Sequence, residues 1–172
     1  TCTVTNMGDK KSRQLIGRSR RLIKDGIIAV VGCYSQTSPE DVAKIEGVNV
    51  VLGTRNKSDI VYWVNMAKDK EKQIVSVSDL VKQNKFEELS INEYQDKTRA
   101  FLKVQDGCNR FCSYCLIPYA RGRSCSKDPD KVIEEVKNLA RHGYKEIIFS
   151  GIQIASYGSD LDGKLSLVDI LE

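Results

Sequence analysis

Three cysteines close together are the part of this sequence with the clearest chemistry. Cys108, Cys112 and Cys115 fall within eight residues, in the spacing Cys-x3-Cys-x2-Cys. Thiolates are the usual protein ligands of iron–sulfur clusters, and three of them leave the fourth iron of a cube without a protein ligand. An open iron is a place where a substrate or cofactor binds. The spacing therefore indicates a cluster with a chemical task.

Two other interpretations of the triplet are a zinc site that lacks a ligand and a set of buried free thiols. A closed zinc site takes four ligands. The fourth would have to be Cys125 or His142, the only histidine of the chain, and neither stands at a customary zinc spacing. We expect Cys125 to be a bystander thiol and His142 to cap a helix C-terminus beside Gly143.

The composition excludes several classes of protein. The chain has 172 residues, of which 41% are hydrophobic, and a net charge of +4. No apolar run approaches the roughly 18 residues of a membrane span, and no signal peptide opens the chain. We expect a cytoplasmic protein without a membrane part. In such a protein, six cysteines favour metal or redox chemistry over disulfides.

The first 67 residues alternate between predicted helices and short apolar strands. Strands are expected over 27–31 and 48–52, and helices over 10–24, 38–47 and 57–66. This order predicts an open parallel α/β layer, in which ligands gather beyond the carboxyl ends of the strands. Cys33 follows the strand at 27–31, and Cys2 lies in what reads as the end of an earlier strand. Both thiols are therefore expected at the same edge.

The helix expected over 10–24 is strongly basic. A charged helix face is usually a solvated face, and its alternative role is contact with the phosphates of a nucleic acid, which gives affinity without sequence choice. Its seven cations are Lys10, Lys11, Arg13, Arg18, Arg20, Arg21 and Lys24.

The second half of the chain reads as a β-loop-α-β unit after a polar linker. The linker is expected over 68–97 and contains a weak strand or two. A strand over 99–105 then leads into the cysteine loop, followed by a helix over 130–141 and a strand over 145–151. This is the start of a parallel barrel and is too short to close one. The predicted domains are 1–67 and 98–172, and the chain reads as a fragment because it opens on Thr1 and ends in what looks like a helix cut short.

The motifs resemble those of a known family. The pattern Cys-x3-Cys-x-Tyr-Cys after a strand, with Tyr114 before the last cysteine, resembles the radical S-adenosylmethionine (SAM) superfamily. The stretches Asp106–Asn109, Pro118–Gly122, Ser150–Ile152 and Tyr157–Gly158 are more closely similar to its methylthiotransferases. Residues 1–5 and 32–36 are similar to the N-terminal domain of that family. The resemblance implies an open α/β domain followed by a partial radical SAM barrel.

The resemblance also implies cofactors and site residues. Two [4Fe–4S] clusters and SAM are expected. The triplet would hold the cluster that binds and cleaves SAM to a 5′-deoxyadenosyl radical. Cys2 and Cys33 would hold the second cluster, with a third ligand that would precede Thr1. The residues implied in SAM binding are Tyr114, Arg121, Gly151 and Gln153.

The implied reaction is methylthiolation at carbon 2 of N6-threonylcarbamoyladenosine in a tRNA anticodon loop, with a flavodoxin or ferredoxin as electron donor. Methylthiolation of isopentenyladenosine or of a ribosomal protein is an alternative within the same chemistry. A non-catalytic metal-binding fragment is an alternative of another class. The 172 residues are expected to be inactive by themselves.

Overall fold

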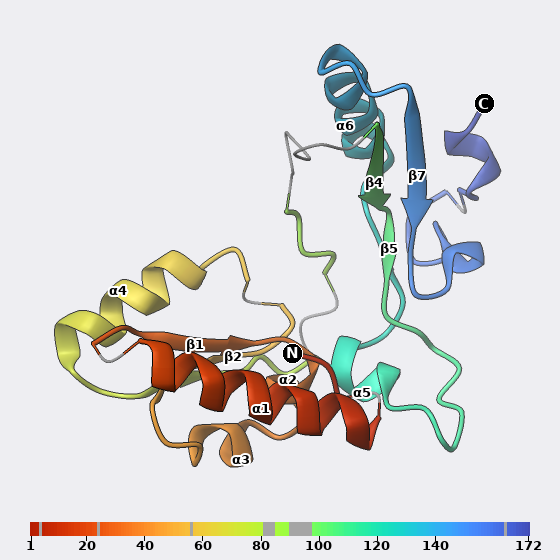
Figure 1. Ribbon diagram of the computed structural model, residues 1–172. Helices are drawn as coiled ribbons and strands as arrows, with labels where there is room; N and C mark the ends of the chain where they lie inside the picture. Colours follow the sequence, from red (N-terminus) through yellow and green to blue (C-terminus); the bar gives the residue numbers. More distant parts are fainter. Residues whose placement is uncertain (4, 24, 56, 81–84, 90–97, 164) are drawn as a thin grey trace. The chain divides into compact units, whose positions relative to one another are not determined.

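The computed structural model describes residues 1–3, 5–23, 25–55, 57–80, 85–89, 98–163 and 165–172 (Figure 1). The chain divides by packing into two units. The first contains residues 1–83 together with 111–121, and the second contains residues 84–110 and 122–172. The chain thus leaves the second unit within the cysteine loop and returns to it after residue 121. Each unit is described by itself below.

The first unit is built on a parallel three-stranded sheet. Its strands, in the order β1-β2-β3, are β1 (Ile28–Val31), β2 (Val48–Leu52) and β3 (Ile74–Ser76). The central strand is buried on both faces, as its uninterrupted apolar sequence predicts. Val48 and Val51 pack in one core cluster, whereas Val50 and Leu52 pack in another. The predicted open α/β layer is confirmed.

Helices cover both faces of this sheet (Figure 1). Ile16, Tyr34 and Val42 pack into the cluster on one face, and Ala67 packs into the cluster on the other. In chain order the helices are α1 (Asn6–Leu22), α2 (Cys33–Thr37), α3 (Pro39–Ala43), α4 (Ile60–Lys70) and α5 (Ile117–Arg121).

Several helix bounds differ from the sequence prediction. The first helix begins at Asn6 instead of Lys10, because the hydroxyl of Thr5 caps it and accepts a hydrogen bond from Gly8 N at 3.0 Å. The second predicted helix is the five-residue α3, and α2, directly before it, was not predicted. Residues 1–3 form no strand; instead the amino group of Thr1 donates to Val31 O at 2.7 Å.

The second unit contains the predicted β-loop-α-β arrangement. β4 (Arg99–Lys103) and β7 (Glu146–Ser150) pair in parallel, and α6 (Pro129–Arg141) lies between them in sequence. A short antiparallel pair, β5 (Gln105–Asp106) with β6 (Cys125–Ser126), flanks the cysteine loop. Short 3-10 helices lie at Ile154–Ser156 and Val168–Ile170. Leu102, Val104, Val132 and Tyr157 form the core.

The linker expected over 68–97 contains regular structure at its start. α4 continues to Lys70, and β3 is the third strand of the first sheet, paired with β2. Residues 81–84 and 90–97 of the expected linker lie outside the described part of the chain. The domain bounds 1–67 and 98–172 stay a prediction.

Tyr157 makes the stability of the second unit depend on pH in the alkaline range. Its hydroxyl donates to Lys127 O at 2.9 Å. Burial raises the pKa of Tyr157 to about 12, helped by the negative charges of Asp128 and Asp160. Since the folded pKa lies above the unfolded value of about 10, the neutral phenol stabilises the fold fully below that value. This contribution is lost as the pH rises toward about 12.

We therefore expect Tyr157→Phe to lower stability near neutral pH, because the hydrogen bond is lost, but to flatten the alkaline decline. Urea unfolding of both proteins between about pH 9 and 12 measures this difference. Lysines titrate in both proteins alike and cancel in the comparison. Parallel declines in the two proteins would contradict the assignment.

Among the helices of the described residues, none combines the length and apolar character that crossing a membrane requires.

Candidate functional site

The turn that leads into the cysteine loop is fixed by Gly107. Its φ of 73° lies in the left-handed region, and a Cβ added there would stand 2.0 Å from Arg123 O and 2.6 Å from Gly122 O. Cys108 N donates to the same Gly122 carbonyl at 3.1 Å. Two backbone segments thus approach each other at a distance that only glycine permits, and Cys108 follows directly.

Gln105 holds this turn from the inside of the protein. Its side chain is fully buried, and its amide nitrogen donates to Asp106 O and Gly107 O, both at 2.9 Å, and to Ser124 Oγ at 3.0 Å. Its amide oxygen accepts from Gln153 N at 2.8 Å. One side chain therefore connects the strand before the cysteines with the loop after β7.

Gly151 lies against this same side chain. A Cβ at position 151 would stand 2.8 Å from Gln105 Oε1 and 2.9 Å from Gln105 Cβ. The absence of a side chain is therefore required by packing in the protein itself. The role of Gly151 in SAM binding stays a prediction.

The structure places Gln153 beside the first cysteine of the triplet. The Gln153 amide lies between Cys108 and the guanidinium of Arg110. With its oxygen toward Arg110 it accepts at 2.8 Å from Nε and 3.0 Å from Nη2, which leaves its nitrogen facing Cys108 Sγ at 3.2 Å. A donor aimed at sulfur stabilises a thiolate, the form that ligates metal.

The other two cysteines belong to the first unit. Cys115 N donates to Cys112 O at 2.9 Å, and α5 follows immediately. Cys112 is exposed and Cys115 is partly exposed, while Tyr114, implied in SAM binding, is 90% exposed. Phe111 opens this segment in the left-handed region, with φ of 45°.

The donor set fits an iron–sulfur cluster in its chemistry. None of the six cysteines forms a disulfide, and the triplet offers three soft sulfur ligands. Within the described residues, no three histidine, cysteine, aspartate or glutamate side chains are already gathered in the arrangement of a metal site. Cys108 belongs to one unit, and Cys112 and Cys115 to the other. Their role as ligands of one cluster stays a prediction.

Cys33 lies at the carboxyl edge of the first sheet, as expected. It is 6% exposed and opens α2 directly after β1. Gly32 before it has φ of 117°, and a Cβ there would stand 2.8 Å from Thr1 O. The residues that precede Cys2 and Cys33 are therefore in contact. Cys2 itself is exposed, and its carbonyl accepts from Ser12 Oγ at 3.3 Å.

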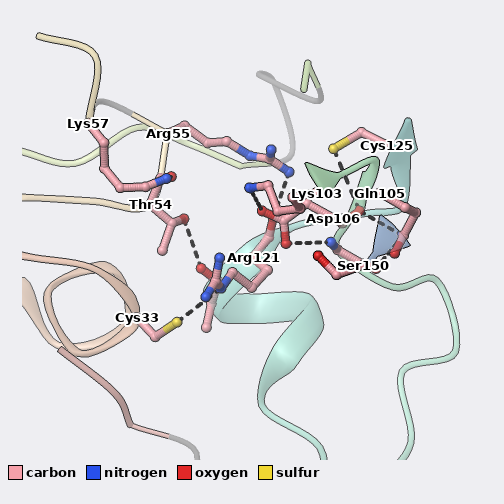
Figure 2. A network of polar contacts seen from close by, with 12 residues as sticks. Cys33, Thr54, Arg55, Lys57, Lys103, Gln105, Asp106, Arg121, Cys125 and Ser150 are labelled. Atoms are coloured by element: carbon pink, nitrogen blue, oxygen red, sulfur yellow. Dashed lines mark hydrogen bonds and ion pairs between the residues drawn. The ribbon is translucent and has the colours of Figure 1, made fainter. Parts of the chain in front are cut away.

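Arg121 lies at Cys33, within the first unit. Its Nε donates to Cys33 Sγ at 3.2 Å. Figure 2 shows this contact together with the polar contacts from the loop after β2. Thr54 Oγ1 donates to Ala120 O at 2.9 Å, and Arg55 Nη2 donates to Arg121 O at 2.8 Å. A contact of Arg121 with SAM stays a prediction.

The remaining chemical residues have structural partners. Cys125 is buried, and its Sγ lies 3.6 Å from Asp106 O within the β5-β6 pair. His142 follows the last turn of α6, where its Nδ1 lies 2.8 Å from Asn138 O. His142 therefore lies at the helix end, as predicted. Sequence reasoning missed Gln105 and Thr54, because a glutamine in a strand and a threonine in a loop carry no signal of their long-range partners.

Replacing Gln105 by leucine should destabilise the second unit. The leucine would remove the partner that Gln105 gives to Gly107 O and Gln153 N, and one of the contacts of Asp106 O and Ser124 Oγ. Unpaired buried polar groups cost about 1–3 kcal/mol each before relaxation, so we expect a loss of about 3 kcal/mol or more in the free energy of unfolding. Urea denaturation followed by circular dichroism measures it.

Gln14→Leu is the matched control, because Gln14 is exposed on α1. Its effect should stay within about 0.5 kcal/mol. A loss below about 1 kcal/mol for Gln105→Leu would show that the hydrogen bonds of Gln105 are not important for stability.

Comparison with known proteins agrees with this arrangement. A parallel strand that runs into a Cys-x3-Cys-x2-Cys loop, followed by a helix and a second parallel strand, defines the beginning of a radical SAM domain. Residues 102–168 match the model of the radical SAM superfamily, and residues 1–53 match that of Uncharacterized protein family UPF0004. The match to this superfamily implies SAM and a [4Fe–4S] cluster as cofactors.

Curated relatives match the chain across both units. The chain is 46% identical to the threonylcarbamoyladenosine tRNA methylthiotransferase MtaB of Bacillus subtilis, over 94% of this chain and 36% of that protein. It is 38% identical to MtaB of Aquifex aeolicus, over 93% of this chain and 39% of that protein. A tRNA-2-methylthio-N(6)-dimethylallyladenosine synthase of Fervidobacterium nodosum is 36% identical, over all of this chain and 39% of that protein.

The chain is similar to radical SAM methylthiotransferases over nearly its whole length. It spans between 36% and 39% of the length of these three relatives.

Proposed function

We propose that the protein containing this chain is a tRNA methylthiotransferase that acts on N6-threonylcarbamoyladenosine. The observation that carries the proposal is the occurrence of two cysteine sets in one chain: the triplet in the loop after β4 and β5, and Cys2 with Cys33 at the edge of the first sheet. The 46% identity to MtaB of Bacillus subtilis favours this substrate over the dimethylallyladenosine of the third relative, at 36%.

The two cysteine sets divide the chemistry. Cys108, Cys112 and Cys115 would hold the cluster that binds SAM, and this cluster would supply the electron for the reductive cleavage of SAM. Cys2, Cys33 and a third cysteine would hold the second cluster, which would supply the sulfur for carbon 2 of the adenine. A second SAM supplies the methyl group, and the electrons come from a flavodoxin or ferredoxin. Tyr114, Arg121, Gly151 and Gln153 remain the proposed SAM contacts.

The residues of the chain itself prepare the first site. Gln105 and Gly107 fix the turn before Cys108, and the Gln153 amide nitrogen faces the Cys108 sulfur. Donors placed at ligating sulfurs orient the ligands and adjust the redox potential of a cluster. In this proposal, these residues hold Cys108 ready for iron before a cluster forms.

We place the tRNA contact partly on the basic face of α1. Arg13 contacts the Tyr34 hydroxyl at 3.3 Å, and Arg20 forms an ion pair with Glu46. Lys10, Lys11 and Arg18 are exposed on the same helix, a distribution that suits phosphate contacts. A cytoplasmic location and the anticodon loop as target are parts of the same proposal.

Nucleoside analysis tests the substrate. The protein containing this chain would be expressed in a bacterium that lacks its own threonylcarbamoyladenosine methylthiotransferase, and tRNA nucleosides would be measured by mass spectrometry. The expected result is the appearance of 2-methylthio-N6-threonylcarbamoyladenosine. Methylthiolation of dimethylallyladenosine or of a ribosomal protein instead would establish one of the alternatives. If the protein contains its cluster but neither the tRNA nor the ribosomal protein is methylthiolated, a metal-binding role without catalysis is favoured.

A further inference from the structure

The contact between Arg121 and Cys33 has a role that SAM binding does not explain. Both residues belong to the first packing unit, and Arg121 Nε donates to Cys33 Sγ at 3.2 Å. Cys33 is buried, and Arg121 is partly buried. A guanidinium stays charged at every physiological pH, and its charge acts more strongly on a partner that is shielded from water.

The backbone of α5 is held through two main-chain oxygens. The last carbonyls of a helix have no partner within it, and here Thr54 Oγ1 and Arg55 Nη2 donate to Ala120 O and Arg121 O (Figure 2). Both contacts use main-chain oxygens. A substitution of the side chain at position 121 therefore leaves these anchors of α5 in place.

Cys33 is held with similar firmness. Its carbonyl accepts from Thr37 Oγ1 at 3.1 Å, and Ser35 Oγ donates to Val30 O at 3.0 Å, which ties α2 to β1. Gln36 accepts from Thr54 N at 3.0 Å and donates to Ser78 O at 3.0 Å. The Arg121 side chain and the Cys33 thiol thus come from two helices, α5 and α2, that hydrogen bonds to neighbouring residues hold in place.

We propose that Arg121, in the loop of the radical-forming triplet, is a positioning residue for the second cluster. Its Nε–H orients the Cys33 sulfur toward the cluster and raises the reduction potential of the cluster. The physical reason is that a hydrogen bond and a positive charge at a ligating sulfur stabilise the more negative, reduced form. The inference rests on the proposed function, because it requires a cluster at Cys33.

A redox titration tests the proposal. In the whole protein that contains this chain, Cys108, Cys112 and Cys115 would be replaced by alanine, so that only the second cluster remains. After anaerobic reconstitution, the reduced fraction would be followed by electron paramagnetic resonance. For Arg121→Met we expect about a tenfold lower ratio of reduced to oxidised cluster at a given potential, about 59 mV for a one-electron couple.

Two further variants separate charge from structure. Arg121→Lys keeps the charge and a donor, so it should restore most of the potential. Arg123→Met is the matched control, because Arg123 is exposed two residues later; it should leave the potential unchanged. If Arg121→Met does not fold, Arg121→Gln takes its place, with a lower potential again expected because the charge is lost.

The outcomes distinguish this inference from the function on which it rests. In the methionine or glutamine variant, the second cluster can form normally while its ratio of reduced to oxidised form changes less than twofold, about 18 mV. This result overturns the role of Arg121 but not the proposed function. A potential that falls equally with Arg123→Met also overturns it. A protein that forms no cluster at Cys33 with its own arginine in place overturns both proposals.

Discussion

Gly107→Ala should unfold the turn before Cys108, the first cysteine of the triplet. The new Cβ would need a left-handed backbone and would stand 2.0 Å from Arg123 O. The conformation alone costs about 1–2 kcal/mol, and a clash between backbone segments cannot be relieved by rotating a side chain. We expect a total loss of about 4 kcal/mol or more in the free energy of unfolding. Hydrogen exchange at Gln105, Asp106 and Cys108, read by mass spectrometry, measures the local loss.

Gly143→Ala provides a control with the same conformation and no clash. Gly143 has φ of 88°, and nothing lies within 4 Å of the added Cβ. This variant should lose only about 1–2 kcal/mol. The difference in the free energy of unfolding between the two alanine variants measures the contribution of the close backbone approach at Gly107. Equal losses would mean that the two backbone segments separate easily there.

Cys112→Ala should abolish the cluster of the triplet. Two thiolates cannot hold a cube whose fourth iron already lacks a protein ligand. We expect the chain, reconstituted anaerobically with iron and sulfide, to lose the absorbance of the cluster and most of about four bound irons. Iron and sulfide analysis together with the visible spectrum measures the loss.

Cys125→Ala controls for the removal of any thiol. Cys125 is 1% exposed and contacts Asp106 O, so its loss should lower stability slightly while leaving the iron content unchanged. An intact cluster in Cys112→Ala would show that the ligands are misassigned. If the protein contains stoichiometric zinc in place of iron, the triplet is a zinc site and not an iron–sulfur site.

The sequence predicted what depends on local pattern. The apolar runs identified β1, β2 and β4, and the helix expected over 130–141 is α6, which the Asp128 side chain caps by accepting from Asp130 N and Lys131 N. Cys33 lies at the sheet edge because the carboxyl ends of parallel strands lie together. These features depend on neighbours within a few positions, so composition and spacing are sufficient to find them.

Long-range partners could not be predicted in the same way. The residue types at positions 105 and 151 do not show that position 151 must lack a side chain to make room for Gln105. The short elements α2 and α5 lack a helical period, and α5 is held by Thr54, whose partner lies 66 positions away. Arg121 was expected at SAM from a motif, whereas its contact with Cys33 spans 88 positions. Only the folded chain shows such pairs.

The assignment of residues 111–121 to the first unit limits how the protein can be dissected. A shortened chain that began at residue 98 would contain every triplet cysteine and the whole radical SAM match from residue 102. It would nevertheless remove the loop after β2 that binds the end of α5, and would uncover Pro118 and Ala120, which are now buried. The region that sequence comparison delimits is therefore not a piece that can be separated cleanly, because residues 111–121 of its cysteine loop pack within the unit that contains the first sheet.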